Sequence, residues 1–131
     1  MDKNSKKLSP LEWEIMNVIW EQEEDVSVRD VLSIAYPQGE KAYTTVQTVM
    51  KNLEEKGFLA KVKIGLVNFY HPLQKKEKII KSETRGFVNR VYNGSFRALA
   101  NYIVDSDSLT LDEIENLKQL IHQKEDKIRG N

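Results

Sequence analysis

The segment AYTTVQTVMKNLEEKGFLAK, residues 42–61, begins with a cluster of polar side chains. These are Tyr43, Thr44, Thr45, Gln47 and Thr48, with Lys51 one turn later. Hydroxyl, amide and ammonium groups hydrogen-bond to phosphate oxygens and base edges, and glutamine can pair with adenine. The alternative is local, because Thr44-x-x-Gln47 also fits a capping box that satisfies free N–H groups at the start of a helix.

A helix cap does not account for every polar residue of this segment. Val46, Val49, Met50 and Leu53 recur at i, i+3, i+4 and i+7, which predicts one apolar stripe on a helix. Thr48 and Lys51 fall on the face away from that stripe. We therefore expect Gln47 and Thr48 to contact bases, while Tyr43, Thr44, Thr45 and Lys51 help to position the helix on DNA.

A β-hairpin is predicted directly after this helix. Gly57 is typical of a residue that closes a helix, and the runs FLAKVKI and VNFYHPL flank Gly65-Leu66 before Pro72. Lys61 and Lys63 alternate along the first run. They fit either a solvated strand face or, as we expect, contacts that neutralise phosphates.

Two further helices are predicted before residue 42. In LSPLEWEIMNVIW, Ser9, Pro10 and Glu12 form a helix start with a capping box, and SVRD repeats this pattern. The second helix should bury Val28, Val31, Leu32 and Ala35, and the turn YPQGE ends it. Three helices followed by a hairpin predict a mainly α, winged helix-turn-helix DNA-binding domain over residues 8–72.

Residues 73–131 read as a separate helical dimerisation domain. Helical runs are interrupted near Asn93-Gly94, and Thr110 with Glu113 forms a further capping box. Helices totalling about 50 residues bury too little apolar surface to be stable alone, so a second copy is expected to cover their apolar faces. The residues expected at this interface are Phe87, Val91, Phe96, Leu99, Ile103, Ile114, Leu117 and Ile121.

The composition excludes several classes of function. The chain has no cysteine and only two histidines, His71 and His122, so we expect neither a metal site nor a cofactor. Nucleophile–base pairs, paired carboxylates and phosphate-binding glycine loops are not recognisable, which argues against an enzyme. No apolar run has the length of a membrane span or signal peptide, and we expect a cytoplasmic protein without membrane insertion. Trp13 and Trp20 are expected in core or dimer packing.

The net charge is zero, but it is unevenly distributed. Residues 8–40 carry one basic and eight acidic side chains, whereas residues 41–63 carry five lysines and two glutamates. The predicted helix and hairpin are therefore locally basic, as nucleic-acid binding requires. The low overall charge leaves a rival hypothesis, a winged domain that binds a protein partner and has no affinity for DNA.

The chain resembles the penicillinase-repressor family over nearly its whole length. The resemblance lies in LSPLEWEIMNVIW, YTTVQTVMKNLEEKGFL, FVNRVYNGSFRALANYIV and LTLDEIENLKQLI. It implies a homodimeric winged-helix repressor that binds inverted repeats in operator DNA, including those of β-lactam resistance or stress genes.

Two positions matter for what this resemblance implies. Gln47 stands where the antibiotic-resistance members carry arginine, and it is closer to the copper-responsive branch, whose paired-cysteine metal hook this chain lacks. The resemblance to the antibiotic-resistance members also implies a way to switch the repressor off. It implies that an Asn–Phe bond of the repressor is cleaved, downstream of a membrane-bound sensor protease. Asn101-Tyr102 occupies the matching position here. The alternative is that Asn101 merely faces solvent and Tyr102 is a partly buried anchor.

Overall fold

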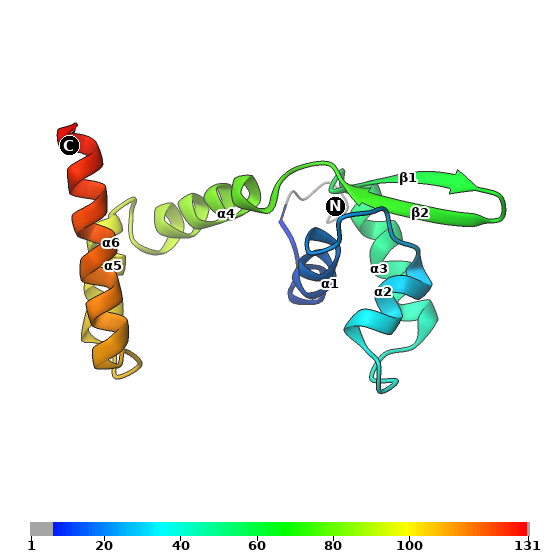
Figure 1. Ribbon diagram of the computed structural model, residues 1–131, viewed down its shortest axis with the longest axis horizontal. Helices are drawn as coiled ribbons and strands as arrows, with labels where there is room; N and C mark the ends of the chain where they lie inside the picture. The colour runs from blue at the N-terminus through cyan, green and yellow to red at the C-terminus, as the bar shows by residue number, and fades with distance from the viewer. Residues whose placement is uncertain (1–6, 131) are drawn as a thin grey trace. The chain divides into compact units, whose positions relative to one another are not determined.

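A computed structural model describes residues 7–130, which contain six helices and one two-stranded hairpin (Figure 1). In chain order these are α1 (Pro10–Trp20), α2 (Val28–Ala35), α3 (Tyr43–Glu55), β1 (Leu59–Ile64), β2 (Val67–Pro72), α4 (Lys76–Val91), α5 (Phe96–Asp105) and α6 (Leu111–Arg129). The predicted mainly α fold with one hairpin is confirmed. The elements form two compact units, and the boundary between Glu83 and Thr84 lies inside α4.

The start of α1 is fixed by a buried ion pair as well as by its cap. Ser9 Oγ accepts a hydrogen bond from the N–H of Glu12 at 3.2 Å, and Glu12 Oε1 accepts one from the N–H of Ser9 at 2.8 Å. The predicted capping box is thereby confirmed. The same Glu12 oxygen lies 2.8 Å from Nζ of Lys56, at the end of α3. Because a buried carboxylate needs such a partner, this pair joins the ends of two helices.

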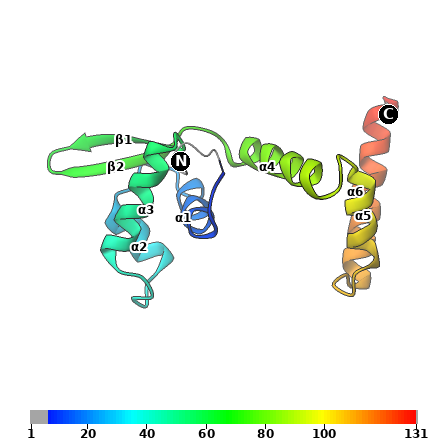
Figure 2. The same cartoon turned by 180° about the vertical axis from the view of Figure 1, so that it is seen from behind.

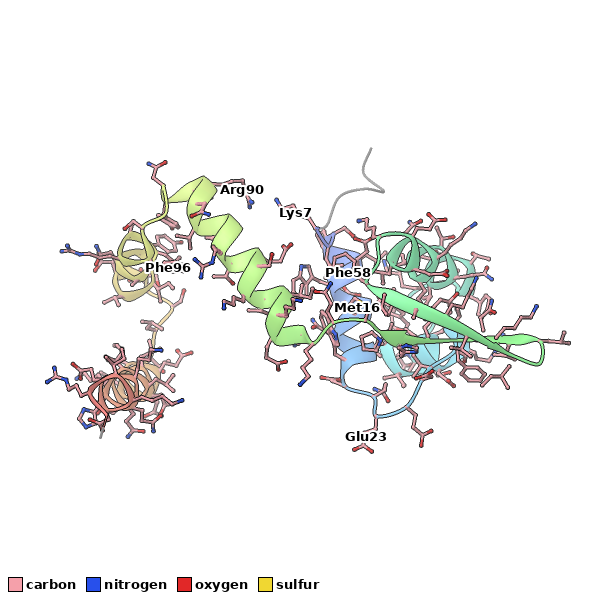
Figure 3. All side chains as sticks on the ribbon, turned by 90° about the horizontal axis from the view of Figure 1, so that it is seen from above. Lys7, Met16, Glu23, Phe58, Arg90 and Phe96 are labelled. Carbon is pink, nitrogen blue, oxygen red and sulfur yellow. The ribbon has the colours of Figure 1, made fainter. Side chains whose placement is uncertain are left out.

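The core of the first unit lies between its three N-terminal helices. As predicted, α3 buries Val46, Val49, Met50 and Leu53. These residues share a core with Ile15, Met16 and Ile19 of α1. Met16 and Phe58 are both buried in this unit (Figure 3). In α2 only part of the prediction holds: Val28 and Val31 are buried, whereas Leu32 and Ala35 are partly buried at the edge of the core.

The two tryptophans belong to the packing of the first unit. Trp13 and Trp20 are partly buried against its core, and their ring centroids lie 5.9 Å apart. Trp20 Nε1 donates a hydrogen bond to the carbonyl oxygen of Gln74 at 3.0 Å. Ile79, on the first turns of α4, is buried in the same core. The start of α4 is therefore tied to the helices that position α3.

The hairpin is attached to the helical core at its base. Leu59 and Tyr70 are buried there, and Tyr70 also forms an antiparallel bridge with Val26, with N···O distances of 2.7 and 3.0 Å. His71 is half-buried and lies 3.2 Å from Asp25. Figure 2 shows α3 beside the base of the hairpin, whose far end extends beyond the helices.

In the second unit, the helices leave many apolar side chains exposed. The predicted break between α4 and α5 is confirmed, because Asn93 and Gly94 adopt φ values of 53° and 85°. The capping box of Thr110 and Glu113 also forms. Val88 is fully buried, but α5 and α6 contain no buried residue. None of the helices described is long and apolar enough to cross a membrane.

Candidate nucleic-acid interface

The first turn of α3 has no side-chain cap. Its N-cap residue is Ala42, whose carbonyl oxygen accepts the N–H groups of Thr45 and Val46 at 3.1 and 3.2 Å. The capping box considered for Thr44 and Gln47 is therefore wrong. The helix begins at Tyr43, which places Thr44 inside the first turn rather than in front of it, where a cap must stand. The polar side chains of this turn need another explanation.

Four of these side chains form one exposed face of α3. Thr44, Gln47, Thr48 and Lys51 are all exposed and follow the i, i+3, i+4, i+7 spacing of a single helix face. Within residues 7–130, none of the four has a hydrogen bond or an ion pair. Thr45 differs, since it is half-buried and so less available to a ligand. The exposed donors and acceptors of this face are free to bind.

The lysines of the hairpin lie on the strand face directed toward α3. Directly paired residues share one face of a two-stranded sheet, and Lys61 pairs with Tyr70 while Lys63 pairs with Asn68. Tyr70 is buried at the base of this face, which identifies it as the inner one. Lys61 and Lys63 are themselves exposed. The predicted lysines are thus on the correct side of the hairpin to act together with α3.

An open groove of about 650 Å³ separates α3 from the hairpin. It is lined by Gln47, Thr48, Lys51, Glu54, Glu55, Lys61, Asn68 and Tyr70. The groove therefore brings together residues predicted from two separate sequence segments. It also contains two carboxylates, and Glu54 lies 3.6 Å from Nζ of Lys61. Lys51 and Lys63 have no ion-pair partner among the described residues, so they are the more available cations.

Tyr43 is held at the start of α3 by a residue that sequence reasoning did not assign to the site. The guanidinium carbon of Arg29, on α2, lies 5.1 Å from the centre of the Tyr43 ring. A cation over an aromatic face is attracted by the ring quadrupole. Arg29 is the one basic residue between positions 8 and 40, and this isolation in an acidic segment is the sequence signal that could have pointed to it. Its pairing with Tyr43 depends on how α2 packs on α3.

The Tyr70 hydroxyl group stays protonated in this groove. Burial raises the pKa of Tyr70 above its ordinary value, and the negative charge of nearby Glu54 raises it further. A neutral phenol can donate a hydrogen bond at physiological pH. Asn68, like Tyr70 a groove residue missed from sequence, contributes an amide to the same groove. Strand alternation alone could have placed it opposite Lys63.

The predicted dimerisation residues are mostly exposed in a single chain. Phe87, Val91, Phe96, Ile103, Leu117 and Ile121 are between 36% and 63% exposed, whereas Leu99 and Ile114 are half-buried. Phe87 contacts Tyr92 edge to face, with ring centroids 5.9 Å apart. Large apolar side chains of this number are unusual on the surface of a stable monomer.

Asn101 and Tyr102 lie in the middle of α5, and both are exposed. Asn101 faces solvent, as the alternative holds, but Tyr102 is 66% exposed in the single chain and is not a partly buried anchor there. A peptide bond inside a helix is a poor protease substrate until the helix opens locally. Since α5 buries no residue, opening it costs little packing energy in the single chain.

The order of the first unit, three helices and a hairpin with an exposed polar face on the third helix, defines the winged helix-turn-helix class. The penicillinase repressor family model matches residues 8–123, which include both compact units. The chain belongs to the penicillinase-repressor family, whose members are transcriptional repressors and not enzymes.

Individual relatives agree with this assignment. The chain is 30% identical to the methicillin resistance regulatory protein MecI of Staphylococcus aureus over 124 residues, covering 95% of this chain and 100% of the relative. It is 28% identical to the penicillinase repressor of Bacillus licheniformis over 121 residues, covering 92% and 94%. The penicillinase repressor of Staphylococcus aureus is 25% identical over 122 residues, covering 93% and 96%.

Proposed function

We propose that this repressor binds double-stranded operator DNA through α3 and the hairpin. The observation that carries the proposal is the exposed, unpartnered face of α3, which opens into the same groove as the lysine face of the hairpin. The major groove of B-DNA admits an α-helix. In this arrangement Gln47 and Thr48 contact base edges, while Thr44, Lys51 and Lys63 contact phosphates.

The second unit makes the repressor a homodimer in this proposal. Six exposed apolar side chains on α4, α5 and α6 provide a surface that a second copy can cover. A two-fold symmetric dimer fits an inverted repeat, with one half-site for each α3. The division of labour is DNA binding by residues 8–72 and dimerisation within residues 73–131, of which residues 73–83 belong to the first compact unit.

The names of the relatives support a target among antibiotic-resistance genes. They are called a methicillin resistance regulatory protein and penicillinase repressors. We propose the same role for this chain, the control of resistance genes, and a cytoplasmic location. No cofactor is needed for it, because the contacts proposed are hydrogen bonds and ion pairs made by side chains.

A mobility-shift assay on promoter DNA and random DNA at two salt concentrations tests the proposal. We expect tighter binding to the promoter, with affinity that falls steeply as salt rises, because phosphate contacts release counterions. The absence of any salt-sensitive binding would contradict the proposal and favour a winged domain that binds a protein partner.

We further propose that cleavage between Asn101 and Tyr102, downstream of a membrane-bound sensor protease, inactivates the repressor. The bond is exposed on a helix with no buried residue, and the cut would divide the apolar surface of the dimer. Weaker dimerisation then releases DNA by mass action. The test is the size of the repressor in cells exposed to a cell-wall antibiotic. Derepression with every copy intact would rule out this switch.

A further inference from the structure

The far end of the hairpin carries an apolar tip. Leu66, in the turn between the strands, is 96% exposed, the highest value among the large apolar side chains of residues 7–130. Its neighbours Ile64 and Val67 pair with each other and are 63% and 46% exposed. At the other end of the same hairpin, Leu59 is 1% exposed. The hairpin is therefore anchored at its base and presents an apolar end to its surroundings.

The fold does not require a leucine in this turn. Gly65 adopts φ 65°, as the first central residue of a type II′ turn must, and Leu66 has no positive φ. The second central position usually holds Asn, Asp or Ser, which are better hydrated. Leu66 contributes nothing to the core, since the core cluster ends at the base of the hairpin. Its apolar side chain needs an explanation outside the folding of the chain.

The neighbouring residues indicate what the tip meets. Lys63 pairs with Asn68 next to the tip, and Lys61 follows toward the base, all on the face directed to α3. With α3 in the major groove, these lysines meet the adjoining phosphate strand. A six-residue strand spans about 17–20 Å, whereas the major groove is about 12 Å wide. In the proposed complex the hairpin is therefore long enough for its tip to reach past the phosphates to the next minor groove.

We propose that Leu66 is an apolar wedge that enters this minor groove and partly unstacks one base step beside each half-site. The proposal rests on the DNA-binding function proposed above. Exposed leucine, isoleucine and phenylalanine side chains act in this way in proteins that bend DNA from the minor groove. Pyrimidine–purine steps unstack most easily, so the wedge makes the stiffness of one base step part of recognition, without hydrogen bonds to its bases.

The experiment uses the full chain and a DNA duplex selected by that chain from a randomised pool. 2-Aminopurine replaces adenine at successive positions flanking the selected half-site, and its fluorescence reports unstacking. We compare the wild type with Leu66→Ser and Leu66→Met. Ile34→Ser is the matched control, because Ile34 is a 47% exposed apolar residue on α2 that lines an acidic surface away from the α3 groove.

We expect the wild type and Leu66→Met to raise the fluorescence at one position per half-site. Leu66→Ser should abolish this signal and weaken binding about tenfold for each half-site, since burying a leucine is worth roughly one to two orders of magnitude in an equilibrium constant. Ile34→Ser should match the wild type. The preference for a pyrimidine–purine step at that position should disappear with Leu66→Ser.

The outcomes separate this proposal from the one on which it rests. If Leu66→Ser binds the selected duplex as tightly as the wild type, with no change in fluorescence, the wedge is refuted while DNA binding stands. An apolar tip that contacts a protein or a second copy instead would give that result. If the wild type selects no sequence from the pool, the proposed DNA-binding function itself fails.

Discussion

Replacing Gln47 by alanine tests whether α3 reads bases. Gln47 is exposed, has no hydrogen-bond partner within residues 7–130, and caps nothing. Its removal leaves no buried group unsatisfied, and alanine is the better helix former by a few tenths of a kcal/mol. The thermal midpoint of unfolding should therefore stay within about 2 °C of the wild type. Any loss of DNA affinity can then be assigned to the contact itself.

The expected size of that loss follows from the chemistry of the side chain. One glutamine amide can make a bidentate contact with one adenine, and such a contact contributes about 1–3 kcal/mol of discrimination against the wrong base. Each protomer should lose this amount on its preferred half-site. Binding to random DNA, which depends on phosphate contacts, should change little because Gln47 is uncharged. The specificity ratio should thus fall at one base position per half-site.

The assay is a titration of the wild type, Gln47→Ala and the control Gln123→Ala against the preferred duplex, its single-base variants and random DNA. Gln123 is an exposed glutamine on α6, in the other compact unit. Equal losses on specific and random DNA would refute base reading by Gln47. Unchanged affinity for every duplex would refute any contact at all.

Three further perturbations test the phosphate contacts, the dimer and the buried ion pair. Lys63→Ala should lower the slope of log affinity against log salt by about one per protomer, and Lys61→Ala by less because it already has a carboxylate partner. A chain ending at Glu83 should be folded, and it should be monomeric in sedimentation and bind the operator poorly. Full affinity of this monomer for the operator would contradict the role of the dimer. Lys56→Met leaves the buried Glu12 without its 2.8 Å partner, which should cost about 3 kcal/mol and lower the thermal midpoint by about 10 °C. An unchanged midpoint in calorimetry would show that the pair contributes no stability.

Local sequence signals predicted most of the elements. Capping boxes at Ser9, Ser27 and Thr110 all form in the structure, because they need only residues three positions apart. Gly57 likewise closes α3 with a φ of 89°. The false capping box at Thr44 shows the limit of such patterns. The pattern is present, but the helix starts two residues too early for it, with Ala42 rather than Thr44 at the N-cap position.

The residues missed from the candidate site share a different cause. Arg29 stacks on Tyr43 from another helix, and Asn68 enters the groove through its register with Lys63. Both side chains reach the site only because their elements pack on α3, although the register that sets Asn68 opposite Lys63 is local to the hairpin. The pairing of Lys61 with Glu54 has the same origin. It makes Lys61 less available to phosphate than Lys63, although the sequence alone gives the two lysines the same role.

The charges in the groove bear on why the proposed repressor has to be a dimer. Glu54 and Glu55 lie beside the same groove as Lys51 and Lys61, so one copy presents little net positive charge to DNA. A single half-site contact is then weak. Joining two such contacts makes the second one intramolecular, which raises the overall affinity without new contacts. On this proposal the repressor holds its operator only while its subunits stay joined. We therefore expect any event that opens the exposed helix α5 to weaken DNA binding, although it occurs in the other compact unit.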